Sequence, residues 1–273
     1  MKIITQVFKK TKKQNRRVLI PFITAGDPNL ETTKKLILTI AQNGGDILEL
    51  GVPFSDPLAD GPTIQVASQR ALKNGVKLAD ILALVKDVRS QTDMPIVLMG
   101  YYNPFFQYGL EHLAQDAAKA GVNGFIIPDL PIEEADEWLK YSRAHHLDTI
   151  FLIAPTTPST RARKIAQKSS GFIYYVSVTG VTGARSDLPE DLIQNLKQLR
   201  QITSRPIGVG FGIASPEHVK RLVPYADGII VGSAIVRIIE KTKDSDEACL
   251  KVGEFVRSLA QATIIEENHS TPS

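Results

Sequence analysis

A carboxylate in an otherwise apolar run is the first feature of this sequence that indicates chemistry. Glu49 stands in the segment ILELG, where every neighbour is apolar or glycine. Burial disfavours the charged form of a carboxyl group and raises its pKa, and such a group can give and take a proton near neutral pH. Glu49 is therefore a candidate general acid/base, with a structural buried glutamate as the alternative.

Other acidic residues lie in a long loop after Glu49 and directly after a later apolar run. Asp60 lies in LADGP and Asp56 between Ser55 and a proline. Because Asp-Gly is a common turn sequence, a turn role stays open for Asp60. Asp129, in IIPDLP, either lines a pocket or begins a helix. These carboxylates are the further candidate acids and bases.

Two glycine-containing segments indicate a phosphate site. GVGFGIAS and VGSAIV each follow an apolar run and place small residues and backbone N–H groups where a helix begins. Helix N-termini and such N–H groups bind anions. Gly183 and Ala184, in a third loop, are placed to complete the site. Tight turns explain either segment alone, but both segments together favour phosphate.

The apolar runs lack the residues that several other kinds of catalysis require. No lysine lies within an apolar run, so a Schiff base has no amine, and none of the five histidines follows a run closely enough to supply a metal site. No cysteine and no G-x-S-x-G motif follows a run either. The residues point to a phosphorylated substrate acted on by carboxylates alone.

The elements that must position these residues recur in one order along the chain. Apolar runs beginning near residues 18, 46, 95, 124, 149, 171, 206 and 228 each precede a helical pattern. They do not alternate cleanly between polar and apolar residues, as expected of parallel strands covered on both faces. Eight such units predict a single (β/α)8 barrel over residues 1–265, with a frayed tail at 266–273. In this fold the carboxyl ends of the strands form the active site.

Two segments depart from this simple repeat. The first 15 residues predict an extra helix over the amino end of the barrel. The interval between the second and third runs is about twice the usual one, which predicts a long loop and an additional helix. Long loops in compact domains usually have a function.

Composition excludes several classes of protein. With 43% apolar and 22% charged residues, the 273-residue chain is not disordered. The net charge is +3, and its basic excess gathers in the first 17 residues, which indicates a solvated end rather than a nucleic-acid surface. A single cysteine favours a reducing cytoplasm, and no run approaches the ~18 residues of a membrane span.

Five motifs resemble one known family. PFITAGDP, LELGVPFSDPLADGPTIQ, SVTGVTGA, GFGI and GSAIV, in this order, resemble the tryptophan synthase alpha subunits from about Phe8 to Glu240. The resemblance implies a lyase that cleaves indole-3-glycerol phosphate to indole and glyceraldehyde 3-phosphate by acid/base retro-aldol chemistry. It implies no cofactor in this chain. The implied partner is a beta subunit, a separate pyridoxal phosphate enzyme, in an alpha2beta2 heterotetramer.

The resemblance also implies roles for individual residues. Glu49 matches the general acid/base, and Asp60 matches the residue that holds the indole N–H and stabilises the cation formed on protonation. The expected substrate-binding residues, with Asp129 from the pattern above, are Phe22, Tyr102, Asp129, Leu152, Tyr174 and Thr182. The expected phosphate-binding residues are Gly183, Gly212, Gly232 and Ser233, and the expected beta-subunit contacts are Pro53, Asp56 and Pro57. Gly100 stands where a larger apolar residue is common in the family.

Two other interpretations stay open at this point. One is another phosphate-binding barrel, such as an indole-glycerol-phosphate synthase or a phosphoribosyl isomerase. Those enzymes usually use a lysine or cysteine at a strand end, which this chain lacks. The other is a noncatalytic subunit that activates a partner, against which the presence of both Glu49 and Asp60 argues.

Overall fold

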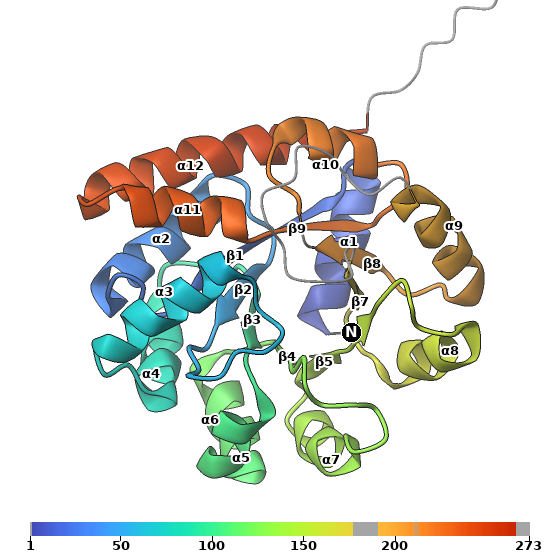
Figure 1. Cartoon of the computed structure of the whole chain (residues 1–273), viewed down its shortest axis with the longest axis horizontal. Helices are drawn as coiled ribbons and strands as arrows, with labels where there is room; N and C mark the ends of the chain where they lie inside the picture. Colours follow the sequence, from blue (N-terminus) through green and yellow to red (C-terminus); the bar gives the residue numbers. More distant parts are fainter. Residues whose placement is uncertain (1, 177–190, 211, 266–273) are drawn as a thin grey trace, which may run out of the picture.

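The computed structural model describes residues 2–176, 191–210 and 212–265, and its strands form one parallel barrel (Figure 1). The strands are β1 Val18–Thr24, β2 Leu48–Gly51, β3 Ile96–Met99, β4 Gly124–Ile126, β5 Asp148–Ile150, β6 Leu152–Ile153, β7 Ile173–Val176, β8 Ile207–Gly210 and β9 Gly228–Val231. β5 and β6 are two parts of one apolar run, separated by Phe151. Because β5 pairs with β4 and β6 with β7, this run closes the barrel. The predicted (β/α)8 fold is confirmed.

Apart from the first helix, which lies at one end of the barrel, the helices surround the barrel in the order of the chain (Figure 1). They are α1 Ile3–Lys13, α2 Leu30–Gln42, α3 Pro62–Lys73, α4 Leu78–Val88, α5 Tyr102–Tyr108, α6 Leu110–Ala120, α7 Asp136–Ala144, α8 Ser159–Lys168, α9 Leu192–Ile202, α10 Pro216–Leu222, α11 Ser233–Lys241 and α12 Ser245–Ala262. The extra helices predicted near the N-terminus and after the second strand are α1 and α3. The short helix α5 is one that the sequence patterns did not predict.

Local sequence explains where several helices begin. The Asn29 side chain accepts the backbone N–H of Thr32 at the start of α2, and Ser215 does the same for His218 at the start of α10. Pro62 opens α3 at a position where a missing N–H costs nothing. This proline therefore fixes the point at which the long loop after β2 ends.

Side chains from alternate strand positions fill the barrel interior. Val18, Ile20 and Phe22 of β1 point inward and pack with a cluster that includes Phe172 and Tyr174. Large aromatic side chains fit here because a glycine faces them. A Cβ atom on Gly210 would lie 2.3 Å from the Tyr174 hydroxyl. The intervening strand residues face outward and pack against the helices in a second, larger cluster.

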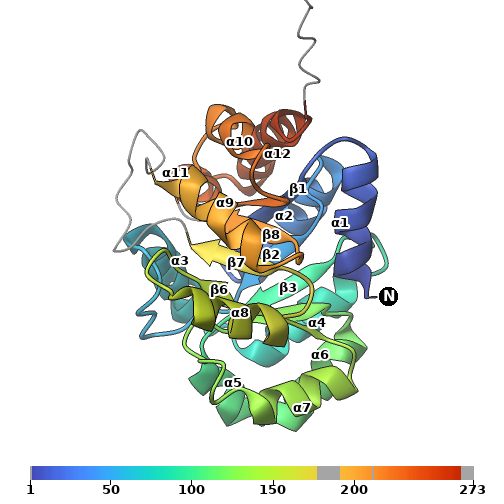
Figure 2. The same ribbon diagram turned by 90° about the vertical axis from the view of Figure 1, so that its right-hand side faces the viewer.

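The helix α1 closes the amino end of the barrel. Its Ile4 and Phe8 side chains are buried in the interior cluster, and the Phe8 and Phe172 ring centroids are 5.7 Å apart. Lys2 Nζ lies 3.0 Å from Oδ1 of the buried Asp148. Figure 2 places α1 and α3 at opposite ends of the barrel. The amino end is thus filled, and the open end is the one that α3 borders.

Two further expectations concern the whole chain. Of the helices that the structure describes, none combines the length and apolar composition needed to cross a bilayer. The tail predicted at 266–273 lies outside the described residues, and the assignment of residues 1–265 to one domain stays a prediction.

Candidate active site

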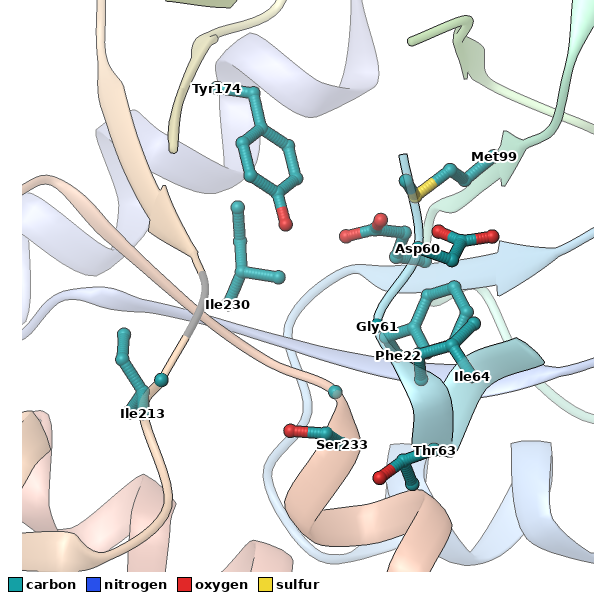
Figure 3. Close-up of a pocket in the computed structure, with 13 residues that line it drawn as sticks. Phe22, Asp60, Gly61, Thr63, Ile64, Met99, Tyr174, Ile213, Ile230 and Ser233 are labelled. Atoms are coloured by element: carbon teal, nitrogen blue, oxygen red, sulfur yellow. The ribbon is translucent and has the colours of Figure 1, made fainter. Parts of the chain in front are cut away.

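A pocket opens at the carboxyl end of the barrel (Figure 3). Residues from β1, β2, β3, β7 and β9 contribute, as do the first residues of α3 and α11. Its lining is Phe22, Glu49, Asp60, Gly61, Thr63, Ile64, Met99, Tyr174, Gly212, Ile213, Ile230, Gly232 and Ser233. The position agrees with that expected for an active site in this fold.

Glu49 lies on β2, in register with Phe22 of β1 and Val97 of β3. The residue is only 1% exposed, and its Oε2 atom has no hydrogen-bond partner among the described residues. Burial, together with the smaller effect of the charge of Asp60, raises the pKa of Glu49 to about 8. A buried carboxyl group without a compensating partner is costly to keep, which favours a functional role over a structural one.

Asp60 ends the long loop, directly before the N-cap residue Gly61 of α3. Burial, partly offset by a hydrogen bond with Tyr101, raises the pKa of Asp60 to about 6. The Tyr101 hydroxyl also accepts the backbone N–H of Ala59 at 2.9 Å, which fixes the loop beside the strand. Near pH 7 Glu49 is therefore mainly protonated and Asp60 mainly ionised, so one pocket holds an acid and an anion.

The wall around the two carboxyl groups is mostly apolar. Phe22, Met99 and Ile230 line it from three strands, and Ile64 closes it from α3. In Figure 3 the Tyr174 hydroxyl points toward the side of the pocket on which Asp60 lies. Such a wall suits an aromatic ring that presents one polar group to a carboxylate.

The other end of the pocket has the character of an anion site. Ser233 is the first residue of α11, and Gly232 is its N-cap. The first N–H groups of a helix lack partners within the helix and attract negative charge. Gly212 lies beside them with φ +77°, a conformation that glycine adopts readily. Gly183, predicted for the phosphate site, and Thr182, predicted to contact the rest of the substrate, lie outside the described residues.

Three predicted substrate contacts are not among the residues that line this pocket. Tyr102 is the first residue of α5 and packs its ring 5.8 Å from that of Phe106. Its backbone N–H donates to Asp129 Oδ1 at 2.9 Å, so Asp129 caps this short helix. Leu152 packs against the interior cluster below the pocket. Contact of these three residues with substrate stays a prediction.

Tyr101 and several lining residues were missed by the sequence patterns. The missed lining residues are Gly61, Thr63, Ile64, Met99, Ile213 and Ile230. A signal for one of them existed, because Val97 and Met99 are alternate residues of β3 and Val97 is paired with Glu49. That alternation selects Met99 for the inner face, whereas Tyr101 follows the strand as the N-cap residue of α5.

Gly100, the departure from the family pattern, also faces away from the pocket. A Cβ atom at this position would lie 2.7 Å from the Phe105 ring and 3.0 Å from Val52. Glycine is therefore required by the packing of α5 on the strand. It does not enlarge the pocket.

The predicted partner contacts lie on the loop between β2 and α3. Pro53 is buried, Pro57 is half-buried and Asp56 is exposed. Leu58, in the same loop, is 95% exposed. Leu58 is thus the most exposed large apolar side chain among the described residues, and it lies on the loop of the predicted partner contacts. Among the described residues, no group of three or more His, Cys, Asp and Glu side chains is arranged to hold a metal ion.

Comparison with known proteins identifies the family to which this site belongs. A model of the tryptophan synthase alpha chain family matches residues 8–264. The alpha chain of Geotalea uraniireducens is 51% identical over 259 residues, covering 95% of this chain and 97% of that protein. That of a Picosynechococcus species is 48% identical over 263 residues, covering 96% and 99%.

Solved structures agree with the sequence comparisons. The alpha chain of tryptophan synthase from Legionella pneumophila has a TM-score of 0.89 and 37% identity, and the match covers 100% of both chains. A structure of tryptophan synthase from Mycobacterium tuberculosis has a TM-score of 0.89 and 35% identity, covering 97% of this chain and 99% of that one. The chain therefore belongs to the tryptophan synthase alpha chain family, whose members are lyases that cleave indole-3-glycerol phosphate in tryptophan biosynthesis.

Proposed function

We propose that Glu49 and Asp60 together carry out the cleavage of indole-3-glycerol phosphate. The observation that supports this most directly is that a buried carboxyl group and a half-buried one line one pocket with different pKa values, about 8 for Glu49 and about 6 for Asp60. Titratable groups whose environments separate their pKa values take separate roles as acid and anion.

Glu49 moves the protons. Its carboxyl group gives a proton to C3 of the indole ring, and the resulting carboxylate takes the proton of the hydroxyl group on the adjoining glycerol carbon. The bond between that carbon and C3 then breaks, and its electron pair returns to the ring. Indole leaves as a neutral molecule, the oxygen becomes the aldehyde of glyceraldehyde 3-phosphate, and Glu49 is protonated again.

Asp60 stabilises the cation that exists between these steps. Protonation at C3 places positive charge on the ring nitrogen, and an ionised carboxylate that accepts the ring N–H lowers the energy of that state. Phe22, Met99 and Ile230 hold the apolar faces of the ring. The phosphate group binds at Gly212, Gly232 and Ser233, where the N-terminus of α11 favours an anion.

The experiment that tests this proposal is indole release by the purified chain across a range of pH. We expect a bell-shaped dependence of kcat/KM, with the acid limb near the pKa of Asp60, about 6, and the alkaline limb near that of Glu49, about 8. The two limbs are properties of the coupled pair. A rate independent of pH across this range would contradict the assigned roles.

A substitution at Gly212 tests the phosphate assignment. Gly212→Val places a branched side chain at a positive φ and displaces the backbone from the anion. We expect KM for indole-3-glycerol phosphate to rise about 10- to 100-fold, because a hydrogen bond to a charged group contributes roughly 1.5–3 kcal/mol. Steady-state kinetics measure the change.

Gly75→Val is the matched control for this experiment. Gly75 also has a positive φ, +71°, but it lies in an exposed turn with no atom near the added Cβ. The control carries the same backbone strain and should keep the wild-type KM. An unchanged KM in Gly212→Val would show that the phosphate group does not bind at this end of the pocket.

Membership of the family gives the chain a beta subunit as its partner, and pyridoxal phosphate belongs to that subunit. The proposed assembly is an alpha2beta2 heterotetramer in which the loop with Pro53, Asp56 and Pro57 contacts the beta subunit. The exposure of Leu58 on this loop supports that contact. A cytoplasmic location stays a prediction.

A charge at Leu58 tests the contact. We expect Leu58→Asp to raise the Kd for the beta subunit at least about tenfold, because burying an unpaired charge costs more than 1.4 kcal/mol. Leu250→Asp is the control, since Leu250 is 62% exposed on the outer helix α12. Equal affinities of the two variants for the beta subunit, measured by titration calorimetry, would show that this loop is not the contact surface.

A further inference from the structure

Arg70 joins three elements around the pocket. It lies on α3, ten residues after Asp60, and its Nε and Nη2 atoms donate to the two carboxylate oxygens of Asp27 at 2.7 and 2.8 Å. Its Nη1 atom donates to Glu240 Oε1 at 3.0 Å. Asp27 is 2% exposed, so this pair is largely shielded from solvent. A bidentate pair in such a setting fixes orientation as well as distance.

Each partner of Arg70 is attached to a different part of the pocket. Asp27 follows β1, the strand that carries Phe22, and its backbone N–H donates to Thr24 O at the end of that strand. Glu240 lies on α11, the helix that begins at Ser233 in the proposed phosphate site. The α3 and α11 helices pack against one another, and Figure 1 shows them side by side. Arg70 therefore links α3, which follows Asp60, to the end of β1 and to α11.

We propose that Arg70 is a positioning residue, which sets the place of Asp60 relative to Phe22 on β1 and to the phosphate site at the start of α11. This inference rests on the proposed function, because it needs both ends of the substrate to be held. Only a guanidinium group has the geometry to hold the Asp27 carboxylate by two bonds and a second carboxylate by a third. Arg70 touches no reacting atom.

A positioning role for Arg70 predicts a different effect of Glu240 on phosphate binding from the one that its charge alone would have. Glu240 is an anion on the phosphate-binding helix, so its neutralisation should tighten phosphate binding if only electrostatics matter. If Glu240 instead holds α11 in place through Arg70, Glu240→Gln should weaken phosphate binding. The sign of the change therefore distinguishes the two explanations.

The test compares Arg70→Lys with Arg16→Lys in the full-length chain. Arg16 also makes a bidentate contact, through Nη1 and Nη2 with Asp46 at 2.7 and 2.6 Å, and is buried to a similar extent, but it lies at the amino end of the barrel. For Arg70→Lys we expect kcat/KM for indole release to fall about 10- to 100-fold, since small misplacements of catalytic groups have effects of this size. We expect Arg16→Lys to lose stability and keep kcat/KM.

Binding of glycerol 3-phosphate, measured by calorimetry, gives a readout independent of the reaction. We expect Arg70→Lys and Glu240→Gln each to bind this probe several-fold more weakly than the wild type. The double variant should bind it no more weakly than Arg70→Lys alone, because both substitutions break one link. Glu240→Gln keeps the Asp27 pair, so it remains informative if Arg70→Lys fails to fold.

The outcomes separate this inference from the proposed function. Equal losses of kcat/KM in Arg70→Lys and Arg16→Lys, or wild-type or tighter probe binding by Glu240→Gln, would overturn the positioning role. A wild-type chain that binds the probe but shows no dependence on Glu49 would overturn the proposed function while the binding results still decided the role of Arg70. A wild-type chain that does not bind the probe would overturn both.

Discussion

Replacing Glu49 with glutamine is expected to lower kcat for indole release by about 10²- to 10⁴-fold, the range typical of general acid/base catalysis. Glutamine keeps the shape and burial of the side chain, but its amide cannot exchange a proton with the indole ring or the glycerol hydroxyl group. Binding of glycerol 3-phosphate should stay close to that of the wild type, because the proposed phosphate site, at Gly212, Gly232 and Ser233, does not include Glu49. Single-turnover assays measure the loss.

Asp148→Asn is the matched control for this variant. Asp148 is also a buried carboxylate, 1% exposed, but it lies at the amino end of the barrel beside Lys2. Its neutralisation should change stability and leave kcat per folded molecule unaltered. Normal turnover by Glu49→Gln would show that Glu49 is a structural residue and that the proton transfers belong to another group.

Urea unfolding shows whether the Glu49→Gln chain is folded and how its stability compares with that of the wild type. The sign of this difference follows from the pKa of Glu49. The raised pKa of Glu49 means that the native chain holds this proton more tightly than the unfolded chain. Its contribution to stability is therefore lost as pH rises from about 4.5 toward about 8. Over that range, the free energy of unfolding of the variant should rise relative to that of the wild type by up to about 1.4 kcal/mol per pH unit, as measured by urea unfolding.

Replacing Asp60 with asparagine is expected to lower kcat and kcat/KM together by about 10²- to 10³-fold, the size found when one stabiliser of a transition-state charge is removed. Asparagine keeps the shape of the side chain and removes its charge. Since the ring carries positive charge only after protonation at C3, KM should change little. Steady-state kinetics with indole-3-glycerol phosphate measure the split.

The pH dependence of the Asp60→Asn variant sharpens this prediction. The acid limb near pH 6 should disappear, and the alkaline limb should stay and move to lower pH, because the charge of Asp60 raises the pKa of Glu49. The losses in Asp60→Asn and Glu49→Gln should not add, since both groups act in one step. A rise in KM with unchanged kcat would reduce Asp60 to a residue that only positions the ring.

The arrangement of strands and helices could be predicted because burial on both faces leaves a direct trace in sequence. The apolar runs that begin near residues 18 and 228 became β1 and β9. The helix α5 was not predicted, since its seven residues are too few to establish a period of 3.6. Glu49 could be identified for the same reason as the strands, because a charged residue inside a buried run is conspicuous.

Contacts between distant segments left no such trace. Asp60 reads as a turn residue in sequence, and only the loop held by Tyr101 and the start of α3 bring it to the pocket that Glu49 lines. The choice between Tyr101 and Tyr102 depends on how the chain leaves β3 and enters α5, because Tyr101 is the N-cap residue of that helix and Tyr102 is its first residue. The bonds from Arg70 to Asp27 and Glu240 span 43 and 170 residues. The sequence by itself determined the elements and the buried acid, because burial acts on each residue locally. The tertiary structure alone decided which groups meet, because those distances depend on the closure of the barrel.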